Sequence, residues 1–259
     1  MPNSSKTEYS SLVKDSKEKG QNMYSQEIEA MMYTCGDVRM PEKESSAYME
    51  QIIYVQMKIL LSKAHEISKT KGSKKISIED IVFLMRNNPY RVKKLSNYIT
   101  FKDVRNKVNR DVISLRNTAE TKLKYSWLPK NVYERYEEMH GRLYAIDKMT
   151  EGMTKEEYLD FTECRQASFT FRKGKRFKEF LNTDYKIKDD LLDILGFLAC
   201  EIVFDIISMA CKISTIKSKK PEIDTDVKGM FKAKTSKHPV TIADIDEACR
   251  RLKIKHIIY

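Results

Sequence analysis

Glycine and proline are scarce in this chain of 259 residues, which has eight glycines and six prolines. Because these two residues are the main helix breakers, their scarcity favours helices. Few stretches alternate strictly between apolar and polar residues, as a half-buried strand would. Hydrophobic residues make up 41% of the chain, which is enough for a packed core. The sequence therefore predicts a mostly α-helical protein with one large domain or two small ones.

Cysteines are few, odd in number and never arranged as CxxC. Without that spacing, a disulfide framework and a zinc site are both disfavoured. Four of the five fall within apolar helical patterns, where a free cysteine behaves as a small hydrophobe. This usage indicates a reducing compartment, cytosol or nucleus. The five residues are Cys35, Cys164, Cys200, Cys211 and Cys249.

The chain has no segment that reads as a signal peptide or a membrane span. Residues 1–23 are polar and lack an apolar core, so they predict a disordered tail. Residues 191–213 are long and apolar enough to cross a bilayer, but they contain four charged side chains. Each charge costs several kcal/mol at bilayer depth, so this segment is predicted to be a helix buried in protein, and no membrane partner is expected.

The net charge is +11 and the pI is about 9.2. A basic surface of this kind points to an acidic partner, either nucleic acid or an acidic protein. The alternative is that lysine-rich helices are simply well solvated.

One short phrase occurs twice, in KKISIEDIVFLMR (74–86) and in HPVTIADIDEACRRL (238–252). In both, a Ser or Thr is followed three residues later by Asp. This spacing predicts a capping box at the start of a helix, with Ser77 and Asp80 in the first copy and Thr241 and Asp244 in the second.

Each phrase follows the same succession of elements. In the first half, a short helix over 25–35, capped by Ser25, precedes a long apolar helix over 45–70. In the second half, a short helix in 173–181 precedes a long apolar helix over 188–214. A further helix is expected over 90–108, and helices are also considered around KNVYERYEEMHGRLYAI in the segment between the halves.

A short–long–short succession with a capped third helix resembles the histone fold. A long helix with apolar residues on several sides is stable only when a second copy covers it. The sequence therefore predicts an all-α fold with two histone folds in one chain, which form an intramolecular head-to-tail pair. The expected division is a disordered tail (1–23), an N-terminal histone fold with an extra helix (24–108), a partly helical linker (109–160) and a C-terminal histone fold (161–259).

Longer stretches resemble the family of the suppressor-of-Ty protein Spt three, the double-histone-fold subunit of the SAGA transcription coactivator. The first half carries QEIEAMMYTCGD, DIVFLMR and FKDVRNK, and the second carries YLDFTECRQASFTFRKGKRFKEFL and DILGFLACEIVFDIISMA. The resemblance implies a nuclear, non-catalytic coactivator subunit. Its implied partners are the TATA-binding protein, which it would recruit or regulate at RNA polymerase II promoters, and other SAGA subunits.

Two sets of charged residues are candidate contact sites. The first is acidic and lies on the second long helix, where it would meet a basic surface of the TATA-binding protein. The alternative is that these acids form a solvated edge of the helix, or ion pairs with Lys and Arg of the first fold. It comprises Asp193, Glu201 and Asp205. The second is basic and lies in the two loops, where phosphates of duplex DNA could bind. It comprises Lys71, Lys74, Lys75, Lys234 and Lys237.

The segment RQASFTFRKGKRF mixes basic and aromatic residues, which could bind single-stranded nucleic acid. The favoured interpretation is that its aromatics anchor the short helix in the core. No catalytic phrase occurs, so no enzyme activity, cofactor, metal or small-molecule substrate is expected. Two other functions stay open: a histone-like module that binds duplex DNA directly, and a scaffold that contacts neither DNA nor the TATA-binding protein.

Overall fold

The structure is a computed structural model that describes residues 22–73, 75–110, 136–185, 187, 189–218 and 238–253, with 103–110, 136–140 and 218 described by their backbone alone. These residues form helices and no strand. The prediction of a mostly helical protein is therefore confirmed. Residues 1–21, which hold nearly all of the predicted tail, lie outside the described part.

Three helices of the first half follow the predicted short–long–short order. They are α2 (Ser25–Thr34), α3 (Lys43–Thr70) and α4 (Ile78–Leu84). The extra helix, α5 (Pro89–Arg110), begins where proline is best tolerated, in the first turn of a helix. The Asn88 side chain accepts a hydrogen bond from the Arg91 N–H at 3.2 Å, which caps this helix.

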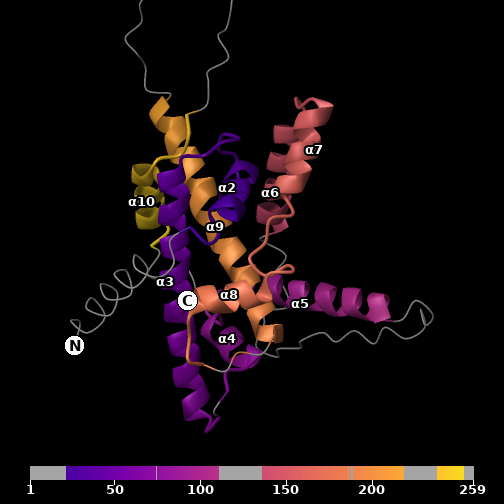
Figure 1. The fold of residues 1–259 in the computed structure, drawn as a ribbon, viewed down its shortest axis with the longest axis vertical. Helices are drawn as coiled ribbons and strands as arrows, with labels where there is room; N and C mark the ends of the chain where they lie inside the picture. Colours follow the sequence, from indigo (N-terminus) through magenta and orange to yellow (C-terminus); the bar gives the residue numbers. More distant parts are fainter. Residues whose placement is uncertain are drawn as a thin grey trace, which may run out of the picture.

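The second half repeats the order. Its helices are α8 (Gly174–Leu181), α9 (Asp189–Ser218) and α10 (Ile242–Arg251). The left-handed backbone of Asn182 ends α8, with φ 39° and ψ 61°. The two long helices, α3 and α9, run through the centre of the molecule, and α5 projects from it (Figure 1).

Both predicted capping boxes are present. The Asp80 carboxylate accepts from the Ser77 N–H at 2.8 Å, and the Asp244 carboxylate accepts from the Thr241 N–H at 3.2 Å. Both Ser77 and Thr241 have extended backbone. The repeated phrase therefore builds the same helix start twice.

The cap predicted at Ser25 is wrong. Ser25 lies inside α2, and its hydroxyl donates to the Asn22 side chain at 3.2 Å. The backbone N–H groups just before α2 instead find their acceptor on another helix. The buried Glu50 carboxylate of α3 accepts hydrogen bonds from the N–H groups of Met23 at 2.9 Å and Tyr24 at 3.2 Å. Burial raises the pKa of Glu50, against the effect of these two hydrogen bonds.

Two helices lie between the halves, α6 (Tyr136–Thr150) and α7 (Lys155–Cys164). Helix α6 overlaps the segment in which the sequence indicates a helix, whereas α7 was not predicted. A capping box of Thr154 and Glu157 starts α7, so the signal was present in the sequence. This helix packs on α2 through Phe161, which is buried and lies edge-on to Tyr33 at 5.5 Å between ring centroids.

Both halves contribute to one hydrophobic core. Helix α2 packs on α3 and α9, α8 packs on α9 and α3, and α10 packs on α9 and α3. The segment with the membrane-like composition is α9; more than half of its most apolar window is buried inside the protein. Hydrophobic burial therefore holds the two long helices together, and each short helix closes part of their surface.

Candidate interaction surfaces

The acidic residues of α9 face cations of α5 and α6. Asp205 pairs with Arg91 at 2.6 Å, and Asp193 pairs with Lys102 at 2.6 Å. Glu201 lies between two cations: it pairs with Lys94 and, at 3.2 Å, with Arg142. The ion pairs that were one interpretation of this acidic set are therefore present in the structure.

Helix periodicity explains why one face of α5 meets this set. Residues three and four apart lie on the same side of a helix, which brings Arg91 and Lys94 over the Asp205 and Glu201 carboxylates. Burial raises the pKa of Asp205, although the Arg91 guanidinium acts in the opposite direction. The contact is thus electrostatic and partly removed from water, where such pairs are screened less than on an open surface.

Arg142 fastens α6 to α9 through two kinds of contact. Its guanidinium carbon lies 3.4 Å from the centroid of the Phe204 ring, and one of its nitrogens donates to Glu201. Arginine is suited to both, because its planar group stacks on rings and also pairs with carboxylates. The sequence allowed ion pairs with cations of the first fold but did not identify the α5 residues that make them, and Arg142 was not expected. Nothing in the local pattern says which distant helix a surface cation meets.

The basic loop set is only partly described. Lys71 pairs with the buried Asp80 carboxylate at 2.6 Å, so an ion pair inside the protein already neutralises the charge of Lys71. Lys75 is exposed. Lys74, Lys234 and Lys237 lie outside the described residues. A phosphate contact by this set stays a prediction.

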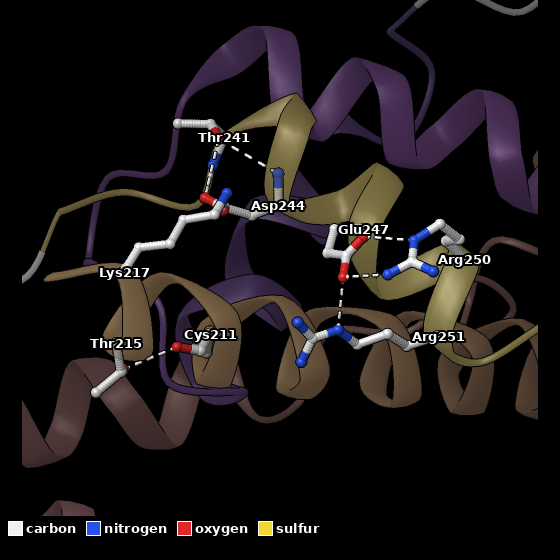
Figure 2. A network of polar contacts seen from close by, with 8 residues as sticks. All are labelled: Cys211, Thr215, Lys217, Thr241, Asp244, Glu247, Arg250 and Arg251. Carbon is white, nitrogen blue, oxygen red and sulfur yellow. Dashed lines mark hydrogen bonds and ion pairs between the residues drawn. The ribbon is translucent and has the colours of Figure 1, made fainter. Parts of the chain in front are cut away.

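The second half contains the same lysine–aspartate pair. Lys217, at the end of α9, reaches the Asp244 carboxylate at 2.5 Å, and the Thr241 hydroxyl donates to that carboxylate at 2.9 Å (Figure 2). Burial by itself would raise the pKa of Asp244, but the bonds from Lys217 and Thr241 outweigh it and lower the pKa below its ordinary value. The pKa of Asp80 is lowered in the same way by Lys71 and Ser77.

The basic and aromatic segment 165–177 is divided between core and surface. Phe169 and Phe177 are fully buried around Tyr24, whose hydroxyl donates to the Phe169 carbonyl at 3.2 Å. The interpretation of these aromatics as core anchors is confirmed for Phe169 and Phe177, whereas Phe171 is exposed. Two cations of the segment, Lys173 and Arg176, pair with Glu27 of α2.

The cysteines are free thiols. Burial raises the pKa of Cys35, Cys200 and Cys249 to about 12, so these thiols are protonated at neutral pH. Among the described residues, no group of three or more His, Cys, Asp or Glu side chains could hold a metal ion.

Comparison with known proteins agrees with this architecture. The family model of the 18 kDa subunit of transcription initiation factor IID matches residues 22–113. This range contains α2, α3, α4 and α5, so the first half of the chain holds a histone-fold domain of the TFIID type.

Relatives extend over more of the chain. SAGA complex subunit Spt3 of Schizosaccharomyces pombe is 31% identical over 91% of this chain and 87% of its own length. Protein SPT3 of Kluyveromyces lactis is 32% identical over 74% of this chain and 75% of its own length. Transcription initiation factor TFIID subunit 13 of Dictyostelium discoideum is 39% identical, but over 29% of this chain and 71% of its own length. The chain belongs to the Spt3 family.

Proposed function

We propose that this protein is a non-catalytic transcription coactivator subunit of a SAGA-like complex in the nucleus, and that it binds and recruits or regulates the TATA-binding protein at RNA polymerase II promoters. The observation that carries the proposal is the similarity to the fission-yeast SAGA complex subunit over 91% of the chain.

The proposal includes an intramolecular histone-fold pair made by residues 24–108 and 161–259. It is supported by the contact between α3 and α9 and by the single shared core. A loop contact supports it as well: the Asp37 carboxylate, which follows α2, accepts a hydrogen bond at 3.0 Å from the Val240 N–H, which lies just before α10. The linker, 109–160, then contains α6, and α7 crosses its end.

The acidic set of α9 is the proposed contact for the TATA-binding protein. The side chains of Asp193, Glu201 and Asp205 are 37%, 15% and 32% exposed while they pair with α5 and α6. A carboxylate has about four lone-pair sites, so it can accept from a partner's cation and from an internal one together. An indirect role is the alternative, in which Glu201 acts only by holding α5 and α6 in place.

A titration of the full chain against the TATA-binding protein tests the proposal. Glu201→Lys places a cation beside Lys94 and Arg142, so we expect it to weaken binding by at least about tenfold, which corresponds to 1.4 kcal/mol. The matched control is Glu163→Lys, because Glu163 is an exposed side chain of α7 and undergoes the same change in charge. Loss of binding in both variants would point to general electrostatics and contradict the proposed site.

The charge swap Glu201→Lys with Lys94→Glu and Arg142→Glu separates the two roles. If Glu201 acts only by holding α5 and α6, the swap restores both internal ion pairs and therefore restores binding. If Glu201 contacts the partner, binding stays weak. Circular dichroism and thermal denaturation check that each variant is folded.

Duplex DNA is titrated alongside at two salt concentrations. Affinity for DNA that falls steeply with salt, without binding to the TATA-binding protein, would replace the coactivator proposal by the histone-like one. Binding to neither would favour the scaffold.

A further inference from the structure

A groove of about 1180 Å³ is lined mainly by α6 and α9, and also by residues at the ends of α2 and α4, at the start of α5 and by Leu252 after α10. We propose that it binds an acidic amphipathic helix of a partner protein. The groove includes Glu201 and Asp205 of the acidic set, so this ligand and the TATA-binding protein would share part of one surface. The test contains no TATA-binding protein, so either proposal can fail alone.

The size and shape of the groove fit a helix better than a small molecule. Its floor follows α9 from Phe197 to Ile216, which at about 1.5 Å per residue is about 28 Å long. Pockets for small molecules have volumes of about 300–1,000 Å³, and they enclose the ligand. A long open groove with apolar walls is the usual site for one face of a helix.

The walls offer exposed apolar side chains to such a face. Tyr144 of α6 is 68% exposed and Ile216 of α9 is 62% exposed, although both are large and apolar. The half-buried Met149 and Met209 lie in the same groove, and methionine side chains adapt their shape to different apolar partners. Burial of this surface would supply the hydrophobic part of the binding free energy.

The charged side chains of the groove determine whether an acidic or a basic partner would bind there. Five cations and two acids line it. Both acids, Glu201 and Asp205, are already paired with Arg91, Lys94 and Arg142.

The two other cations are Lys148 of α6 and Lys212 of α9. Both are exposed, and among the described residues neither has an acidic partner within 4 Å. They would pair with acidic residues at the flanks of the bound helix and would repel a basic one.

The test measures the binding of a labelled peptide to the full chain by fluorescence anisotropy. The probe is a peptide of about 20 residues, which spans about 30 Å as a helix. It carries Leu and Phe at helical spacing on one face and Asp and Glu on the flanks. We expect binding with one peptide per chain, and affinity that decreases with salt.

Two double variants isolate the charge effect. Lys148→Glu with Lys212→Glu is expected to weaken peptide binding by about tenfold or more. The matched control is Lys175→Glu with Lys178→Glu, because both lysines are exposed on α8, outside the groove. It changes the net charge equally and is expected to alter the affinity by less than about twofold.

Apolar recognition is tested by Ile216→Ala, which is expected to weaken binding severalfold because it removes exposed apolar surface from the groove. The proposal is overturned if the parent chain does not bind the peptide, as when another segment already fills the groove. It is also overturned if a scrambled or a lysine-substituted peptide binds equally well, or if the control variant weakens binding as much as the groove variant.

Discussion

In the first half of the chain, Lys71 pairs with an aspartate nine residues later; in the second half, Lys217 pairs with one twenty-seven residues later. The geometry is nevertheless the same. In both halves the aspartate caps its own helix through a Ser or Thr and binds a lysine from the end of the preceding long helix. We call this lysine–aspartate pair, together with its helix cap, the anchor. The comparison shows that the anchor depends on where the two helix ends meet, and not on the length of the loop between them.

The halves differ in what surrounds the anchor. Helix α4 has seven residues and is followed directly by α5, whereas α10 has ten residues and carries Glu247, which pairs with Arg250 at 2.6 Å and Arg251 at 2.7 Å on its outer surface (Figure 2). The long helices differ too, since α3 has no glycine and α9 has one, Gly196.

The largest effect is expected where the halves meet. Tyr24 is fully buried between α2 and the rings of Phe169, Phe177 and Phe180. Tyr24→Ala should lower the free energy of unfolding by about 3–5 kcal/mol, since it leaves a cavity and removes aromatic contacts. Denaturant titration measures the change.

The number of transitions in that titration tests whether the halves are independent. We expect one transition in the parent and in the variant, because both halves share one core. Two transitions, of which Tyr24→Ala shifts only one, would show that the halves unfold separately. Phe171→Ala is the control, because this ring is exposed.

The second prediction tests the equivalence of the two anchors. Asp80→Asn and Asp244→Asn should each cost about 1–3 kcal/mol, because each removes a charge-assisted bond and a helix cap. Similar losses would support the equivalence. A loss at only one position would show that loop length matters after all.

The same two variants have a defined pH dependence. The pKa of both carboxyl groups is lowered in the folded protein, so their stabilisation is present above the ordinary pKa of aspartate and is lost as the pH falls through the lowered folded pKa. The difference in stability between the parent and either variant should therefore shrink in acid. A difference that grows in acid would contradict the assigned bonds.

The next largest effect is expected at Gly196, the glycine that α9 has and α3 lacks. A Cβ at this position would lie 2.4 Å from Thr170 Cγ2 and 2.9 Å from Thr170 Oγ1, so the Thr170 side chain or the backbone that carries it must shift. Gly196→Ala should cost about 1–2 kcal/mol despite the better helix propensity of alanine.

Thr170→Ala should recover part of the Gly196→Ala loss in the double variant, because it removes the two nearest atoms. Gly174→Ala is the matched control, since its Cβ would lie 3.6 Å from Leu192, an ordinary contact. Thermal and denaturant unfolding measure both. Equal effects at the two glycines would show that the contact with Thr170 is not tight.

The smallest effect is expected at the Glu247 ion pairs of α10, which have no counterpart in α4. Glu247→Gln removes the ion pairs with Arg250 and Arg251, which lie on the surface and exchange with water. The midpoint of thermal unfolding should change less than in any variant above, and high salt should abolish the difference. A larger change would indicate that this network supports α10 as the anchor does.

Much of the fold follows from local sequence patterns. Apolar residues at helical spacing predicted both long helices, and the Ser77–Asp80 and Thr241–Asp244 spacings predicted both capping boxes. The T-x-x-E signal of α7 was equally local and was overlooked. Ser25 shows the limit of local patterns, because a carboxylate from α3 takes over the start of α2.

The sequence by itself determined the helical class, the repeated succession of elements and the family, because helical periodicity, caps and residue identity are properties of neighbouring positions. Only the tertiary structure decided the partners of the charged residues. It directed Lys71 to Asp80, the α9 acids to α5 and Arg142, and left Lys148 and Lys212 beside an open groove. Charges act over distances set by how helices pack, and packing brings together residues that are far apart in the chain.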